Sequence, residues 1–166
     1  MRYFLSLSYK GTHYHGWQIQ PNALTVQEVI NNAISRITRE EVNVTGCGRT
    51  DTGVHASYFV LHFDLLHAIE DQSKFLYHLN AVLPDDIAAF EIVPVAKASH
   101  ARFDATARQY HYFLAKTHQP FLKPFTHRLV KIPDAAKLND AAKIVTAQTD
   151  FASFCKAHAD NKTTVC

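Results

Sequence analysis

Apolar and polar residues alternate at the beginning of the chain, over residues 2–9. Successive side chains of a strand point to opposite faces of the sheet, so a period of two predicts a strand with one buried face. That face would carry Tyr3, Leu5, Leu7 and Tyr9. Residues 10–23 are expected to form a loop, because glycine, proline and asparagine punctuate them.

The apolar period lengthens to that of a helix after residue 24. Thr25 and Glu28 have the spacing of a capping box, in which each side chain bonds an amide that the first helical turn leaves unpaired. Apolar residues then recur every third or fourth position, which predicts an amphipathic helix. Its buried stripe would be Val26, Val29, Ile30, Ala33, Ile34 and Ile37.

Further strands and one helix complete the first part of the chain. A short helix is expected from Ser73, as its cap, through Leu79, and Pro84–Asp86 is typical of a turn. Strands are expected at 42–47, 57–65 and 87–97. The resulting order, β-α-β-β-α-β, is that of the ferredoxin-like motif. The predicted fold class is therefore α/β (α+β), with a ferredoxin-like unit over residues 1–98.

The pattern restarts at residue 99 and does not contain enough elements to close a second sheet. A long strand is expected over 105–116, with Arg108, Tyr110 and Tyr112 on one face. A helix is expected to begin at Pro133 and Asp134, with inner positions Leu138, Ala141 and Val145. Residues 99–166 therefore predict part of a second, related unit.

Charge separates the two parts. Residues 1–98 carry 7 Lys and Arg against 10 Asp and Glu, whereas residues 99–166 carry 10 against 5, which gives the net charge of +2. Within 99–131 the basic residues alternate with aromatic ones, and Asp104 is the one acidic residue. Basic side chains can contact the phosphates of RNA, and aromatic rings can stack on its bases. A strand that is simply exposed to solvent would have the same composition.

Several other classes of protein are disfavoured. No apolar run approaches the roughly 20 residues that cross a bilayer as a helix, and the first residues are too polar for a secretory signal. A cytoplasmic protein is therefore expected. Cys47, Cys155 and Cys166 form no Cys-x-x-Cys pair, so they are interpreted as free thiols of a reducing compartment.

Residues 48–56, Gly-Arg-Thr-Asp-Thr-Gly-Val-His-Ala, are the most distinctive part of the sequence. Gly48 and Gly53 permit tight turns, and Arg49 and Asp51 lie two residues apart between two predicted strands, where a loop can present both to a cleft. A structural turn with a surface ion pair, which would contribute about 0–1 kcal/mol, is the alternative interpretation.

This run resembles the signature of the TruA-type tRNA pseudouridine synthases, many of which have alanine where Thr52 stands here. Further segments resemble the family in the same order along the chain: 9–11, 16–20, 25–27, 62–63, 79–80, 83–87, 101–110 and 150–154. Members of the family are longer, so the chain is expected to be the N-terminal part of such a protein. The resemblance implies the pseudouridine synthase fold and a homodimer that modifies tRNA in the anticodon stem-loop, at uridines 38 to 40.

The resemblance also implies roles for single residues. Asp51 would be the nucleophile, Arg49 would displace the target nucleotide, and Tyr110 would stack on the uracil. Arg108 and His55 are expected beside them at the substrate site. Turning a base about and rejoining it requires no net electron transfer, so no metal and no cofactor are expected.

Other interpretations stay open from the sequence. A non-catalytic RNA-binding module would keep the basic, aromatic stretch without a complete active site. His13 and His15 could begin the metal site of a hydrolase, but no nearby residue completes a known spacing. Trp17 could contact RNA or simply pack in the core. A structural hydrogen bond is the alternative to an acid–base role for both His55 and His62.

Overall fold

A computed structural model describes residues 1–155 and residue 165. The chain divides into two compact units, Met1–His111 and Tyr112–Cys166, and each is described by itself. The division falls later than the expected boundary after residue 98, because residues 99–108 are hydrogen-bonded to the first unit. In the described part of the chain, no helix is both long enough and apolar enough to cross a membrane.

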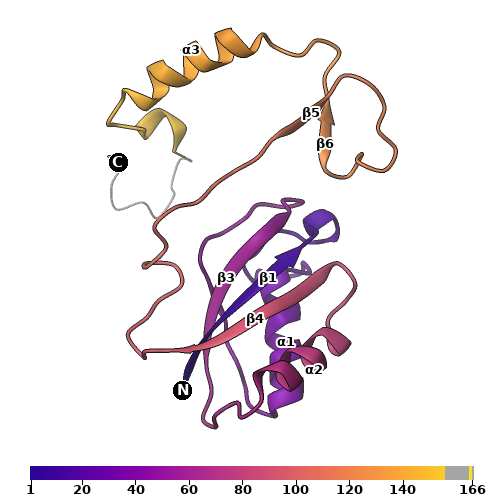
Figure 1. Ribbon diagram of the computed structural model, residues 1–166, viewed down its shortest axis with the longest axis vertical. Coiled ribbons are helices and arrows are strands. Elements are labelled where there is room, and N and C mark those ends of the chain that lie inside the picture. Colours follow the sequence, from indigo (N-terminus) through magenta and orange to yellow (C-terminus); the bar gives the residue numbers. More distant parts are fainter. Residues whose placement is uncertain (156–164, 166) are drawn as a thin grey trace. The chain divides into compact units, whose positions relative to one another are not determined.

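The first unit is a four-stranded antiparallel sheet with two helices (Figure 1). The strands have the spatial order β2-β3-β1-β4, so β3 and β1 are the two central strands. In chain order the elements are β1 (Arg2–Tyr9), α1 (Val26–Thr38), β2 (Thr45–Gly46), β3 (Ala56–Asp64), α2 (Gln72–Val82) and β4 (Ile87–Val95). This order confirms the predicted β-α-β-β-α-β arrangement.

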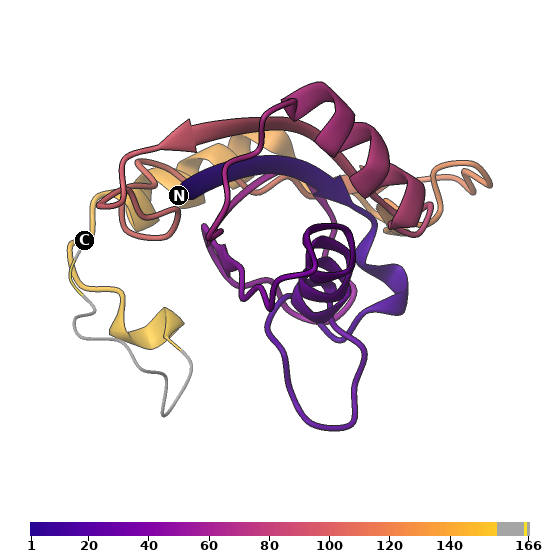
Figure 2. The same cartoon turned by 90° about the horizontal axis from the view of Figure 1, so that it is seen from below.

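One face of the sheet forms the core with the two helices. The predicted inner face of β1 is buried, and the stripe of α1 supplies Val26, Ile30 and Ile34 to the same cluster, while Leu79 comes from α2. Figure 2 shows α1 nearly end-on against the sheet. The cap of α1 is the predicted one, since Thr25 Oγ1 accepts the Glu28 N–H at 3.4 Å. Trp17 packs in this core, 4.3 Å from Phe59 between ring centroids, which settles its role as packing.

Two predicted boundaries in this unit were wrong. The strand expected at 42–47 is reduced to Thr45–Gly46, because side chains of α1 take the backbone groups that a ladder would use. Asn31 Oδ1 accepts the Val44 N–H at 2.9 Å, and Ser35 Oγ accepts the Val42 N–H at 2.9 Å. The cap of α2 is Asp71 rather than the expected Ser73, since Asp71 Oδ1 accepts the Lys74 N–H at 2.9 Å.

The second unit contains a small parallel pair of strands, β5 (Phe113–Ala115) and β6 (Thr126–Arg128), and the helix α3 (Ala135–Thr146). Asp134 caps α3, as its predicted start requires. The long strand expected over 105–116 was wrong: only Phe113–Ala115 pairs, because β6 offers just three partners. The expected inner positions of α3 are exposed, since no described element covers them: Leu138, Ala141 and Val145.

Candidate active site

The loop between β2 and β3 carries both Arg49 and Asp51, and both side chains are exposed. The ion pairs in the described part of the chain join other residues: Arg2 with Asp64, His67 with Glu40, and Lys143 with Asp140. Arg49 and Asp51 are thus not bound to each other. This geometry disfavours the interpretation of the loop as a turn closed by a surface ion pair.

The backbone of this loop is fastened to residues 9–17 of the first unit. Thr50 is held twice: its carbonyl accepts the Trp17 N–H at 3.0 Å, and its hydroxyl lies 2.9 Å from the Tyr9 hydroxyl. The Gly53 N–H donates to the Tyr14 carbonyl at 3.2 Å. Asp51 therefore projects from a backbone that is fixed on both sides of it.

His55 supports the same loop from its far end. Its Nδ1 accepts the Gly11 N–H at 3.0 Å, and the ring is half-buried. Gly11 is required here, because a Cβ at this position would lie 2.0 Å from the Val54 carbonyl oxygen. The structure thus gives His55 the structural hydrogen bond that the sequence left as an alternative to acid–base chemistry.

Gly16 lets the two segments approach on the other side. Its φ of +85° is in the left-handed region that L side chains rarely adopt. A Cβ there would also lie 2.5 Å from the Thr50 carbonyl oxygen. The loop 10–23, whose glycines the sequence interpreted only as turn signals, is therefore the support on which the Asp51 loop lies.

Two buried tyrosines stabilise this support: Tyr9, which the sequence indicated only as a core residue, and Tyr14, which it placed in a loop. Burial raises the pKa of Tyr9 to about 12, and the hydrogen bond to Thr50 opposes that rise in part. Burial, followed by the bond to Asp86, raises the pKa of Tyr14 well above its usual range. The Tyr14 hydroxyl donates to Asp86 Oδ1 at 2.6 Å. Both phenols are neutral at physiological pH, so they act as fixed hydrogen-bonding groups.

Arg108 lies against the beginning of the Asp51 loop. Its Nε and Nη2 donate to the Cys47 carbonyl at 3.0 and 2.6 Å, and Nη2 also donates to the Arg102 carbonyl at 2.9 Å. Tyr110, two residues further on, is exposed. It lies close enough to Tyr9 to contribute, after burial and Cys47, to the raised pKa of that phenol. The first unit therefore brings Arg108 and Tyr110 to the same edge as Arg49 and Asp51.

The histidines of the loop 10–23 do not form a metal site with their neighbours. His13 and His15 are exposed. Among the residues that the structure describes, no group of three or more His, Cys, Asp and Glu side chains could hold a metal ion. The hydrolase interpretation therefore gains no support.

Comparison with known proteins defines the class to which this sheet and its aspartate loop belong. A family model described as tRNA pseudouridine synthase matches residues 6–104, which include the aspartate loop and all of the sheet except the beginning of β1. The chain is 45% identical over 165 residues to tRNA pseudouridine synthase A of Bacteroides fragilis, and 45% identical over 168 residues to that of Bacteroides thetaiotaomicron. It is 40% identical over 159 residues to tRNA pseudouridine synthase A of a Thermoanaerobacter species.

These alignments cover 99%, 99% and 95% of this chain. The chain belongs to the tRNA pseudouridine synthase family. It spans 66%, 61% and 64% of the length of these three relatives, respectively. The matched residues include the Asp51 loop, its supporting loop and the segment around Arg102, but family membership alone does not assign their roles.

Proposed function

We propose that the protein isomerises uridine to pseudouridine in the anticodon stem-loop of tRNA, at positions 38 to 40, with Asp51 as the nucleophile. The observation that carries the proposal is the state of Asp51: an exposed carboxylate on a loop whose backbone is fixed by Tyr9, Tyr14 and Trp17. Membership of the family and the names of the relatives support the reaction and the substrate class.

The reaction breaks the bond from the sugar C1′ to N1 of uracil and forms a bond from C1′ to C5. A carboxylate can attack the sugar or the ring as a transient covalent partner, and it leaves again when the new bond is complete. The proton lost from C5 is replaced by one gained at N1, so atoms and electrons balance within the nucleoside. The site therefore has to hold the Asp51 carboxylate at a fixed position beside the nucleoside.

The neighbouring residues take the other tasks in this proposal. Arg49 contacts phosphate and displaces the target nucleotide, for which a guanidinium fork is suited. Tyr110 stacks on the loosened uracil, an interaction of about 1–3 kcal/mol that keeps the base from leaving. Arg108 and His55 belong to the substrate-binding part of the site, where each fixes backbone of the surrounding loops. Turning the uridine out of a stem costs a few kcal/mol, which contacts to the rest of the RNA must supply.

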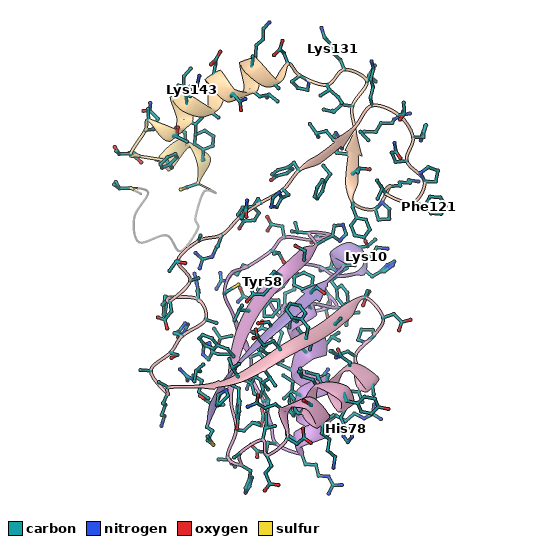
Figure 3. The ribbon with its side chains drawn as sticks, in the orientation of Figure 1. Lys10, Tyr58, His78, Phe121, Lys131 and Lys143 are labelled. Carbon is teal, nitrogen blue, oxygen red and sulfur yellow. The ribbon has the colours of Figure 1, made fainter. Side chains whose placement is uncertain are left out.

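The second unit offers side chains for such contacts. Lys116, Lys123 and Lys131 are exposed there, as is Phe121, at 95%. Figure 3 labels Phe121 and Lys131. Cations supply most of the non-specific affinity for RNA, and exposed rings stack on unpaired bases. We propose that these four side chains contact RNA. The proposal further includes a homodimer, as the family implies, and the cytoplasm, where tRNA is modified.

The direct test is release of tritium from tRNA labelled at C5 of uridine, with the full-length protein that carries this chain. Asp51→Asn keeps the size of the side chain and removes its charge. It is expected to lower the rate of release by more than about 10³-fold while tRNA affinity is retained, because the nucleophile is lost and the binding surface is not. Asp85→Asn, at an exposed carboxylate in the turn before β4, is the matched control and should retain turnover.

The outcomes separate the two candidate functions. If wild-type protein binds tRNA and releases no label, the RNA-binding module replaces the enzyme. If Asp51→Asn releases label at the wild-type rate, the isomerase can stand but Asp51 is not its nucleophile. Nearest-neighbour analysis of the product would then show which uridine has been converted, and conversion outside positions 38 to 40 would contradict the proposed specificity.

A further inference from the structure

We infer that Arg108 is a positioning residue, which fixes the segment that carries Tyr110 against the loop that carries Asp51. The inference rests on the proposed function, because it concerns the distance between these two groups. Its distinguishing feature is that Arg108 acts through backbone carbonyls of the protein rather than through a phosphate of the RNA.

The hydrogen bonds of Arg108 are directed inward. One guanidinium donates twice to the Cys47 carbonyl and once to the Arg102 carbonyl, at 3.0, 2.6 and 2.9 Å. Hydrogen bonds from a charged donor are stronger than those between neutral groups, although exposure to water weakens them at this position. Lysine cannot reproduce them, because its ammonium is a single point whereas the guanidinium is a planar fork.

The segment is also anchored upstream of Arg108. The Ala101 N–H donates to Nδ1 of the buried His62 on β3 at 3.1 Å, and the Ser99 carbonyl accepts Arg2 Nη1 at 2.9 Å. The edge of the His62 ring contacts His100, with 4.6 Å between centroids. The backbone is thus held at residues 99–102, and Arg108 fastens it again just before Tyr110.

The Cys47 carbonyl, which accepts two hydrogen bonds from Arg108, lies at the beginning of the Asp51 loop. Cys47 is fixed to β3, because its N–H donates to the Val60 carbonyl at 2.8 Å. Gly48 follows directly, and a Cβ there would lie 3.3 Å from Arg108 Nε. A side chain at Gly48 would therefore crowd the guanidinium, which would have to shift by a few tenths of an ångström.

The functional consequence concerns geometry rather than affinity. In the proposed reaction Tyr110 and Asp51 act on the same nucleotide, and they come from segments far apart in the sequence. A misplacement of about 1 Å can cost about 10²-fold in rate. By joining the two segments at Cys47, Arg108 sets the distance between the stacking ring and the nucleophile.

The test compares Arg108→Lys and Arg108→Met in tritium release from C5-labelled tRNA. Both are expected to lower kcat by about 10²-fold while KM and the salt dependence of binding stay at wild-type values, because both lose the fork. A phosphate contact would behave differently. Arg108→Met would then raise KM and reduce the salt slope by about 1, and Arg108→Lys would stay close to wild type. That result would overturn the inference.

Arg102→Met is the matched control. It removes the same charge from the same segment without removing a bond to the Asp51 loop, since only its backbone makes the contacts described above. A fall in kcat as large as that of Arg108→Met would trace the effect to charge and contradict the positioning role.

Gly48→Ala probes the same contact from the other side. It should lower kcat by less than the Arg108 variants do, because the added methyl group displaces the guanidinium by only a few tenths of an ångström. The loss should disappear in the Arg108→Met background, where no guanidinium remains to be displaced. Additive losses would show that the methyl group acts on the substrate directly, which would contradict the inference.

A measurement without substrate keeps failure of this inference distinct from failure of the proposed function. Chymotrypsin should cleave after the exposed residues Phe103 and Tyr110 faster in both Arg108 variants than in wild type, because the segment is released. Unchanged cleavage would overturn the positioning role whether or not the protein turns over. If both variants are cleaved faster but the wild-type protein shows no turnover, the structural link stands and the isomerase is rejected.

Discussion

The two units of the chain use their apolar residues in opposite ways. In the first unit, two helices cover one face of the sheet, and side chains such as Leu5, Ile34 and Leu61 have no exposed surface. In the described part of the second unit no side chain reaches that burial, and large apolar residues such as Phe121 and Val130 are 95% and 90% exposed. Similar hydrophobicity thus has different consequences, because a core needs a second layer as well as apolar residues.

The difference matches the division of labour that we propose. The nucleophile and the rings that hold its loop come from the unit with a close-packed core, where positions are fixed to fractions of an ångström. The lysines proposed to contact the rest of the RNA come from the unit whose side chains remain accessible. The side chains that act on the reacting bond need fixed positions, whereas those that contact phosphates need to be exposed.

The comparison can be tested with two leucines, both on helices. Leu79 of α2 is fully buried, whereas Leu138 of α3 is 48% exposed. Leu79→Ala is expected to lower the free energy of unfolding by about 2–5 kcal/mol, because it leaves a cavity. Leu138→Ala should change it by less than about 0.5 kcal/mol. Trp17, the one tryptophan of the chain, is buried in the first unit, so its fluorescence during urea unfolding reports that unit.

Far-ultraviolet circular dichroism reports total helix content, so it follows the unfolding of α3 together with that of α1 and α2. If Leu138→Ala destabilises the Trp17 transition as much as Leu79→Ala does, the two leucines belong to one cooperative core. The contrast between the units would then not hold.

The sequence predicted the first unit well because its signals are local. Alternation in β1, the stripe of α1 and the capping threonine follow from neighbours a few residues apart, and all three were confirmed. The Asp51 loop was recognisable as well, since its residue types and spacing are contiguous. The exposure of both Arg49 and Asp51 agrees with their expected presentation by a loop.

The parts that could not be predicted depend on partners distant in the sequence. Alternation over 105–116 indicated a strand, but most of that segment has no strand beside it, and Arg108 instead bonds a carbonyl 61 residues away. Likewise, Val42 and Val44 look like strand residues, yet α1 binds their amides. The support of the loop by Tyr9 and Tyr14 was hidden for the same reason, because Tyr9 resembles an ordinary core residue and Tyr14 lies in a predicted loop.

Removing cations from the second unit should sharpen the comparison by weakening RNA binding alone. The double variant Lys116→Gln with Lys123→Gln is expected to reduce the slope of log Kd against log salt by about 2, with kcat at saturating tRNA retained. The matched control is Lys137→Gln with Lys143→Gln on α3, which changes the net charge equally. Filter binding of tRNA at several salt concentrations measures the slope. An equal reduction in both double variants would show that total charge decides affinity, rather than the basic stretch.

The smallest expected effect is a pH dependence of the first unit that comes from His62. Burial, followed by the charges of Arg2 and His100, lowers the pKa of His62 below its usual value of 6.5. The unfolded chain therefore binds more protons at this residue than the folded one does, so its contribution to stability is complete above pH 6.5 and is lost as the pH falls below it. A protonated ring would also stop accepting the Ala101 N–H.

His62→Asn isolates this contribution, because the amide oxygen can accept the same N–H and does not titrate. The stability difference between wild type and His62→Asn, measured by Trp17 fluorescence, should be constant from pH 7 to 8 and should turn against wild type between pH 6.5 and 5. His13→Asn, at an exposed histidine of the first unit, is the control for general histidine titration. A constant difference across the whole range would show that His62 is not the titrating group, and the anchor at Ala101 would then be insensitive to pH.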